Sequence, residues 1–396
     1  MLILFISVSL NVANEIAVSA ASIQAEQLYT VAERVMDKIL LTTGIPADWG
    51  NNVTVTPGDI SDFGLALNGT RTPYELDPDK VMRLANLSTL PNPLFMNASR
   101  IAELLGISDK YGFKLEMHPL LRQEILPIDF YDLPGKNLSI PVVFNVIVRN
   151  WYDFGIPGAS VTGIYVLVKI SPGAAGKQPT IQEKTFWAKT NVTDVKGICV
   201  LNFKNEVSNH ISNQAGGQRW YIYFLILHTN WYGFVSVSGY TKSSLEGAPV
   251  EGYIIGDAVI LNSTVEGLRG AVITKDEIIQ VIPEYESLLA FSEIEWCRQQ
   301  PNDPEWCKKA GNVLPSSRDY LIGRIKSLEK ISSHVFVFGK WRGQPIAIVI
   351  NRIPDLTITF GHQKAQPANS VVLTRLAQLY NYPYIIRLTI WRKTEG

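Results

Sequence analysis

The segment Ile140-Pro-Val-Val-Phe-Asn-Val-Ile-Val148 decides the fold class of the central part of the chain. It is apolar and rich in β-branched residues, as buried strands are. Five similar runs follow, separated by the Gly, Pro, Asn and Asp residues typical of turns. They cover residues 161–170, 185–189, 198–203, 220–228 and 234–239. Six short strands at this spacing predict a β-sandwich over residues 133–245.

The part of the chain before the predicted sandwich, residues 45–132, mixes turns with short helices. Helical pieces are expected near Asp77 and over residues 98–106, because each has a capping residue at its start and a Gly or Asn near its end. Residues 112–118 follow a different pattern. There Phe113, Leu115 and Met117 alternate with polar residues, which predicts a half-buried strand.

The part after the predicted sandwich, residues 246–396, combines helices and strands. We expect helices over 275–298 and 318–328, and strands over 334–340, 344–350 and 384–391. In the last of these runs Ile386, Leu388 and Ile390 share one face of the strand. Such an apolar face predicts that this strand closes a sheet.

The N-terminal segment Met1-Leu-Ile-Leu-Phe-Ile-Ser-Val-Ser-Leu10 is almost wholly apolar, and no Lys or Arg occurs before Arg34. No Pro or Gly occurs before Gly44, so residues 1–44 are predicted to form one long helix. The predicted fold class is therefore α+β, with a long N-terminal hydrophobic α-helix followed by a β-rich globular head that contains the sandwich. The predicted domains are residues 1–44, 45–132, 133–245 and 246–396.

Several interpretations of the N-terminal run are open. A lone membrane span needs about 20 apolar residues, whereas Asn11 interrupts this run after ten. A secretory signal has a small-residue cleavage pattern like Val18-Ser-Ala20 but also a basic start, which is missing. A buried core helix is the plainest alternative. We favour a helix that packs against copies of itself, and the residues expected to make that contact are Leu2, Leu4, Phe5, Ile6, Val8 and Leu10.

The composition argues against nucleic acid as a partner. Lys plus Arg and Asp plus Glu number 36 each, so the chain has no net field to attract a polyanion. At 46% hydrophobic and 18% charged residues, a chain of 396 residues can bury several cores.

Two features of the sequence predict an extracellular location. Asn-X-Ser/Thr triplets, the acceptors of N-linked glycans, occur at Asn52, Asn68, Asn86, Asn97, Asn137, Asn191 and Asn262. In addition, Cys297 and Cys307 each follow a Glu-Trp pair and flank a loop with two prolines, which predicts a disulfide between them. Cys199 lies in an apolar run and is expected to be a buried free thiol.

Two groups of segments resemble known families. Gly155-Ile-Pro-Gly-Ala-Ser-Val-Thr162, followed by Thr190-Asn-Val-Thr-Asp-Val-Lys-Gly197, resembles the immunoglobulin-like repeats of many surface proteins. The segments Leu40-Leu-Thr-Thr-Gly-Ile-Pro-Ala-Asp-Trp49, Phe63-Gly-Leu-Ala66, Leu76-Asp-Pro-Asp-Lys-Val81 and Arg387-Leu-Thr-Ile-Trp-Arg392 resemble archaeal pilin-like surface proteins related to type IV pilins.

The pilin-like resemblance implies a structural subunit of an extracellular filament. Its N-terminal helix would be held in the membrane before assembly and packed against copies of itself afterwards, with a glycosylated head outside for surface exposure or adhesion. The immunoglobulin-like unit would be an insertion that enlarges this head.

The sequence offers little for catalysis. The five histidines stand singly, without a His-Glu-X-X-His motif, and Gly-X-Ser-X-Gly and phosphate-loop motifs are missing. We therefore expect no catalytic residue, no metal and no cofactor. One rival is a membrane-anchored glycan hydrolase that uses acids such as Glu284 and Glu286 or Glu293 and Glu295. The other is a glycan-binding adhesin, for which the exposed aromatic residues would be Trp151, Tyr152, Trp231 and Tyr232.

Overall fold

The structure is a computed structural model. It describes residues 23–85, 94–133, 139–171, 180–212, 220–241, 251–262, 270–274, 289–297, 304–313, 320–325, 334–341, 344–352, 357–362, 369–380 and 382–393. The assembly residues predicted between Leu2 and Leu10 lie outside these ranges.

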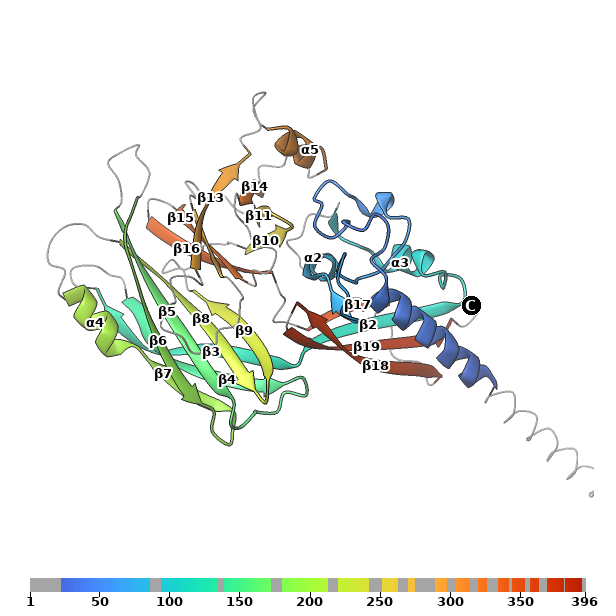
Figure 1. The fold of residues 1–396 in the computed structure, drawn as a ribbon, viewed down its shortest axis with the longest axis horizontal. Coiled ribbons are helices and arrows are strands. Elements are labelled where there is room, and N and C mark those ends of the chain that lie inside the picture. Colours follow the sequence, from blue (N-terminus) through green and yellow to red (C-terminus); the bar gives the residue numbers. More distant parts are fainter. Residues whose placement is uncertain are drawn as a thin grey trace, which may run out of the picture.

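The first sheet brings together strands from both ends of the chain (Figure 1). It has five strands in the order β1-β18-β19-β2-β17. Their bounds are Glu75–Leu76 for β1, Ser370–Leu379 for β18, Tyr382–Arg392 for β19, Tyr111–Pro119 for β2 and Ile358–Gly361 for β17.

Apolar residues on neighbouring strands of this sheet stand directly opposite one another. Leu388 of β19 pairs with Leu373 of β18 on one side and with Leu115 of β2 on the other. All three are buried, as are Ile386 and Ile390 on the same strand. The alternation predicted for β2 and β19 is thus confirmed, and this sheet has one continuous apolar face.

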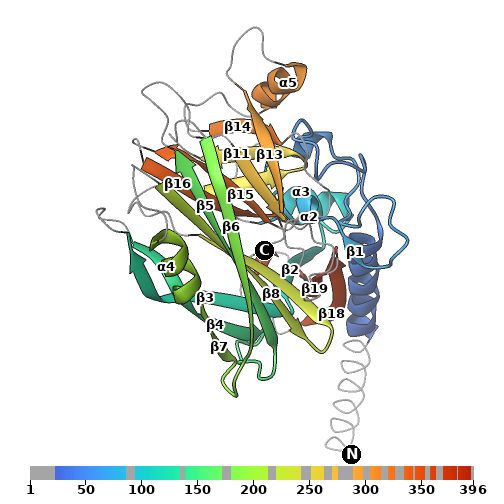
Figure 2. The ribbon, with the colours of Figure 1, turned by 60° about the vertical axis from the view of Figure 1, so that its left-hand side comes forward.

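A helix over residues 23–41 lies along this sheet (Figures 1 and 2). The helix buries one stripe against the sheet's apolar face. The stripe consists of Leu28, Ala32, Val35, Met36, Ile39 and Leu40. At the edge of this contact the Arg392 guanidinium donates to Gln27 Oε1 at 3.0 Å, and Arg375 lies 3.9 Å from Glu33.

The prediction of an α+β fold with a long N-terminal apolar helix is wrong. The chain is mostly β, and its first described helix covers residues 23–41 only. Most apolar residues lie in strands whose partners are far away in the sequence. Local periodicity does not reveal such pairing, so it could not predict these strands. Within the described residues, no helix has the length and apolar character needed to cross a membrane.

Three short helices lie in sequence between the first helix and β2, near the C-terminal end of the first helix. They are the 3-10 helix η1 (Pro57–Asp59), α2 (Pro78–Met82) and α3 (Ala98–Leu104). Asp77 caps α2 by accepting from Asp79 N, and Asn97 caps α3 by accepting from Arg100 N. Both helices were predicted, although they are shorter than expected.

All six strands predicted for the sandwich are present, in two sheets of three and four strands, but the seventh strand, over residues 121–132, lies before the predicted start at residue 133 and was missed. One sheet of the sandwich is β3-β4-β7 and the other is β6-β5-β8-β9. The bounds are Leu121–Asp132 for β3, Ser139–Asn150 for β4, Ser160–Ser171 for β5, Thr180–Val192 for β6, Ile198–Asn202 for β7, Trp220–Trp231 for β8 and Phe234–Tyr240 for β9, with α4 (Lys204–Ser212) between β7 and β8.

One buried core joins the two sheets of the sandwich. Within it the Tyr165 hydroxyl of β5 donates to Pro141 O of β4 at 3.0 Å, and so links the sheets directly. The sandwich also contacts the first sheet, because Val235 and Val237 of β9 pack against the apolar residues under the first helix.

A further antiparallel sheet has seven strands in the order β10-β11-β14-β13-β12-β15-β16. The bounds are Glu251–Ile255 for β10, Ala258–Asn262 for β11, Gly270–Thr274 for β12, Leu289–Trp296 for β13, Tyr320–Ile325 for β14, His334–Trp341 for β15 and Gln344–Asn351 for β16, with α5 at Glu305–Val313.

Two predicted helices in this region are wrong where the structure describes them. Residues 289–296 and 320–325 are the paired strands β13 and β14, and residues 275–288 lie outside the described part. Each of these strands has a partner on both sides, so cross-strand pairing overrides the local helical pattern. The predicted strands at 334–340 and 344–350 are confirmed as β15 and β16.

Candidate functional site: the helix-end network

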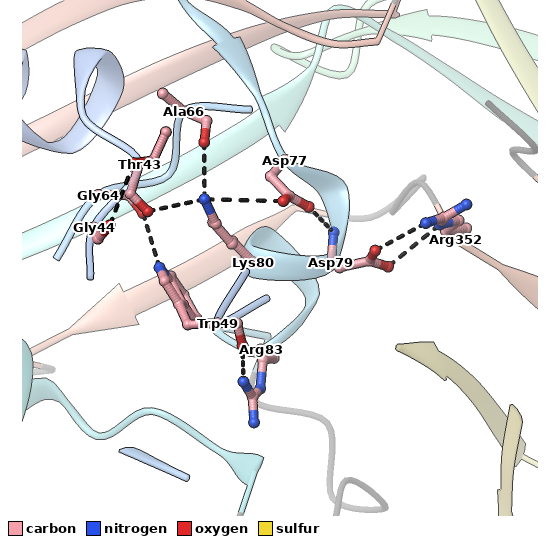
Figure 3. Close-up of polar contacts among 10 residues, drawn as sticks. All are labelled: Thr43, Gly44, Trp49, Gly64, Ala66, Asp77, Asp79, Lys80, Arg83 and Arg352. Atoms are coloured by element: carbon pink, nitrogen blue, oxygen red, sulfur yellow. Dashed lines mark hydrogen bonds and ion pairs between the residues drawn. The ribbon is translucent and has the colours of Figure 1, made fainter. Parts of the chain in front are cut away.

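Three of the four segments that carry the pilin-like resemblance, residues 40–49, 63–66 and 76–81, meet at the C-terminal end of the first helix (Figure 3). Their polar residues form a buried cluster, which we call the helix-end network. It consists of Thr43, Gly44, Trp49, Gly64, Ala66, Asp77, Asp79, Lys80, Arg83 and Arg352. These residues come from four stretches of sequence, so the network fixes several loops at once.

Glycines let the backbone segments approach closely enough to form the network. Gly44 has a φ of +74°, a conformation that favours glycine just after a helix. A Cβ at Gly64 would lie 2.1 Å from Thr42 O, and a Cβ at Gly50 would lie 2.4 Å from Lys80 Cγ. The Gly44 and Gly64 positions belong to the quoted motifs, which explains why those motifs contain glycine.

Lys80 stands at the centre of the network and is fully buried. Its Nζ donates to Thr43 O and to Ala66 O, both at 2.9 Å, and lies 3.9 Å from the Asp77 carboxylate. Burial lowers the pKa of Lys80, and Asp77 is the largest opposing influence. Thr43 comes two residues after the last helical residue, so the ammonium ion also compensates the negative end of the helix dipole.

Asp77 is the residue of the network most sensitive to pH. Its pKa is raised to about 6. Burial is the largest cause and the nearby Asp79 charge acts in the same direction, whereas Lys80 and two backbone N–H groups lower the pKa. One of these N–H groups belongs to Asp79, which donates to Asp77 Oδ1 at 2.9 Å. The carboxyl group therefore caps α2 but keeps its proton more readily than an exposed aspartate.

Arg83 and Trp49 hold the loops that surround the network. The buried Arg83 guanidinium donates to Leu94 O at 3.2 Å and also to Trp49 O and Val55 O. The Trp49 Nε1 donates to Gly64 O at 3.2 Å, while Lys80 and Arg83 each lie 5.9 Å from the centre of its ring. Burial lowers the pKa of Arg83 to about 10. One aromatic ring thus contacts both cations.

Asp79 connects the network to the seven-stranded sheet. Arg352, directly after β16, donates to the Asp79 carboxylate through Nε at 3.3 Å and through Nη2 at 2.8 Å. Burial alone would lower the pKa of Arg352, but the charge and hydrogen bond of Asp79, together with Tyr380 and Asp77, outweigh burial, so the pKa is raised. The Arg352 guanidinium also lies 5.9 Å from the Tyr380 ring, in the turn between β18 and β19. Three parts of the fold therefore meet at one ion pair.

This arrangement gives the network a structural role. The charged residues of the network are all at most 4% exposed, and their donors are engaged with backbone carbonyls or carboxylates. Among the described residues no group of three His, Cys, Asp or Glu side chains is placed to hold a metal ion. What the network can do is hold the first helix, the first sheet and the seven-stranded sheet in a fixed relation.

The predicted glycan acceptors have different surroundings. Asn68 is exposed in a turn, Asn97 caps α3, and the amide groups of Asn52 and Asn191 donate to Asp48 and to Val200 O. Asn262 ends β11. Asn86 and Asn137 lie outside the described residues.

The structure joins Cys297, directly after β13, to Cys307 in α5 by a disulfide. Cys199 is a buried free cysteine, and burial raises its pKa to about 11. Of the acids considered for a hydrolase, Glu293 and Glu295 lie on β13 rather than on a helix, and Glu284 and Glu286 lie outside the described part.

Sequence reasoning identified several residues of the network only as parts of a resemblance and missed Arg352 altogether. The signal for Lys80 and Asp77 was the motif Leu76-Asp-Pro-Asp-Lys-Val81, with a capping residue before Pro78. Arg352 is 273 residues from Asp79, and no local pattern marks it as a partner. No protein-family model matches the chain, and a search of curated proteins finds no match either.

We predict that the Asp79–Arg352 pair is strongly coupled. Arg352→Met or Asp79→Asn should each lower the free energy of unfolding by about 3–5 kcal/mol, because each leaves a buried charge without its partner. The double variant should lose much less than the sum of the two. The matched control is Arg324→Met, which removes an exposed pair with Asp257 and should cost less than about 1 kcal/mol. Denaturant unfolding measures all four, and additive losses would contradict the coupling.

We also predict that Asp77 contributes less to stability at neutral than at acidic pH. Its folded pKa of about 6 lies above the ordinary value of 3.8, so folding takes up a proton between these values. The stability from this group is complete below pH 4 and is lost as the pH rises through 6, by up to about 3 kcal/mol. Asp77→Asn keeps a capping side chain. It should remove this part of the pH dependence of unfolding, and an unchanged slope would refute the assignment to Asp77.

Proposed function

We propose that the protein is a non-enzymatic structural subunit of an extracellular filament of the pilus type, located at the cell surface. In this proposal the N-terminal segment associates with the membrane before assembly and with copies of the chain in the filament. The β-rich body forms the outer part. The observation that carries the proposal is the way in which the first helix is anchored.

The first helix is held by its C-terminal part and exposed at its start. Residues 28–40 bury a stripe against the five-stranded sheet, whereas residues 23–27 are exposed on every side. The helix therefore leads away from the body towards the segment that contains the apolar run Met1–Leu10. A globular part joined by a helix to an apolar segment is what we expect of a subunit that assembles through that segment.

The helix-end network supports the proposal because it supplies a stiff junction. A force applied to the helix would be transmitted to Lys80 through its hydrogen bond to Thr43 O. From the neighbouring Asp79 it would pass to the seven-stranded sheet through the ion pair with Arg352. A second tie joins Lys38 of the helix to Leu104 O and to Asp62, at 2.9 and 2.8 Å. Buried charges with several hydrogen bonds do not shift to other positions without losing those bonds. The junction would therefore transmit force without rearranging.

Surface features of the body agree with an extracellular location. The disulfide between Cys297 and Cys307 is a bond typical of oxidising compartments. Asn68, in an Asn-Gly-Thr acceptor triplet, is exposed in a turn where Gly69 has open space around it. A glycan attached there would extend into solvent.

Charge in the N-terminal segment should abolish assembly. Phe5→Asp or Ile6→Asp would place a carboxylate where an apolar side chain is expected to be buried, and burying one such side chain is worth about 1.5–3 kcal/mol. We expect sheared fibres that contain this chain to disappear from electron micrographs. Val195→Asp, at a position 87% exposed on the body, is the matched control and should leave them intact. Normal fibres from the Phe5→Asp variant would refute the proposed assembly.

Asn68 should be the most fully glycosylated acceptor among those described. Its side chain is exposed, whereas the amide groups of Asn52 and Asn191 are engaged with other residues. Mass spectrometry of peptides from the native protein should show a glycan on Asn68, and Asn68→Gln should remove it. An unmodified Asn68 peptide from native material would contradict this expectation.

A further inference from the structure

The sequence Asn-Trp-Tyr-X-Phe occurs twice, as Asn150-Trp-Tyr-Asp-Phe154 and as Asn230-Trp-Tyr-Gly-Phe234. Both copies form turns at strand ends, the first directly after β4 and the second between β8 and β9. We call them the two aromatic turns. The repeat does not depend on the proposed filament function, and neither the helix nor the helix-end network contains it.

The two aromatic turns lie at the same end of the sandwich. Asn150 stands opposite Leu121 at the start of β3, and the Ser236 hydroxyl of β9 donates to Leu121 O at 3.1 Å. Ser236 is only two residues beyond the second turn. In the other sheet Asn230 stands opposite Ser160, which begins the strand that follows the first turn.

In each turn the asparagine organises the backbone. Asn150 Oδ1 accepts from Tyr152 N and from Phe154 N, both at 3.0 Å, and Asn230 Oδ1 accepts from Gly233 N at 3.0 Å. These side chains hold the turns in one conformation before any ligand arrives, which reduces the entropic cost of binding.

In each turn the tryptophan is an anchor and the tyrosine is presented to solvent. Trp151 packs against His118 of the first sheet, with ring centres 5.7 Å apart, and Trp231 packs against the sandwich core. By contrast Tyr152 is 62% exposed and Tyr232 is 89% exposed. The Tyr152 ring rests on Trp151 with centres 3.6 Å apart, so the ring is supported on one side and open on the other.

In the second turn the exposed tyrosine has an unfavourable backbone conformation. Tyr232 has a φ of +50° and Gly233 a φ of +85°, the two positive values of a type I′ turn. Asparagine is the favoured residue at the first of these positions, and a large aromatic residue is an outlier there. The Tyr232 ring meets Trp231 edge-on, with centres 5.3 Å apart, but most of it faces solvent. A residue that is both strained and exposed supports a role in binding.

We propose that the two aromatic turns form a binding site for a neutral glycan. The apolar face of a pyranose ring would stack on Tyr152 and Tyr232, and Tyr and Trp supply such contact area at low entropic cost. The rim is polar: the exposed Asp153 carboxylate lies 3.8 Å from Arg149 and 3.9 Å from Arg122, and Arg149 lies 4.0 Å from Glu124. Carboxylate and guanidinium groups match sugar hydroxyls, and these balanced charges give the rim no net field to attract an anionic surface.

The test uses the full chain and a panel of neutral hexasaccharides built from glucose, mannose, galactose or N-acetylglucosamine. Binding is followed by calorimetry and by the fluorescence of the neighbouring tryptophans. We expect at least one hexasaccharide to bind. Tyr232→Asn should weaken binding at least tenfold without lowering the melting temperature, because asparagine suits the turn better than tyrosine. Tyr232→Phe keeps the ring and should retain binding, and Tyr152→Ala should weaken it.

Phe130→Ala is the matched control, since Phe130 is also exposed on the sandwich but lies at the far end of β3, opposite Pro141. It should leave binding unchanged. Three outcomes would overturn the proposal: no binding of any hexasaccharide, binding that Tyr232→Asn does not weaken, or binding of the wild type to vesicles of phosphatidylcholine and phosphatidylglycerol in place of sugars. Loss of self-association in Tyr232→Asn, with no sugar binding by the wild type, would assign the turns to a contact between copies instead.

Discussion

The buried ammonium group of Lys80 is the constraint on which the arrangement of the first helix depends. Its two carbonyl partners belong to Thr43, at the end of the helix, and to Ala66, in the loop that precedes β1. An uncompensated ammonium ion in this position would be too costly to bury, so both carbonyls must stay where they are. The helix end, the loop and α2 are therefore fixed by a requirement for hydrogen bonds and not by apolar contact alone.

The same reasoning explains how a long excursion of the chain is accommodated. Between β2 and β17 the chain builds the sandwich and the seven-stranded sheet before it returns to the first sheet. Near that return the Arg352 guanidinium meets the carboxylate of Asp79 next to the Lys80 cluster. An apolar contact would tolerate several registers, whereas a buried bidentate pair is satisfied in only one. The ion pair thus specifies where the excursion rejoins the first unit, at some cost in desolvation.

Features with a local signal could be predicted from the sequence, and features with non-local causes could not. Phe113, Leu115 and Met117 alternate within seven residues, and this alternation was enough to predict β2 and its buried face. The strand over Tyr320–Ile325 was predicted as a helix because its local sequence carries no sign of its partners. Those partners, β11 and β13, are supplied by other parts of the chain. The network had a similar limit: the cap and the acids next to Lys80 are local, but Arg352 is distant and lacks any motif of its own.

The two aromatic turns show how an identical pentapeptide pattern can be used in two different backbones. In the first turn the positive φ falls on Asp153, and in the second it falls on Tyr232. The shared elements are the asparagine that accepts backbone N–H groups and the packed tryptophan, which contacts His118 in the first turn and the sandwich core in the second. What the repeat preserves is therefore the presentation of the tyrosine and not the turn type. Folding alone would be served as well by Asn-Gly at the second turn, so the retained tyrosine is best explained by contact with something outside the chain.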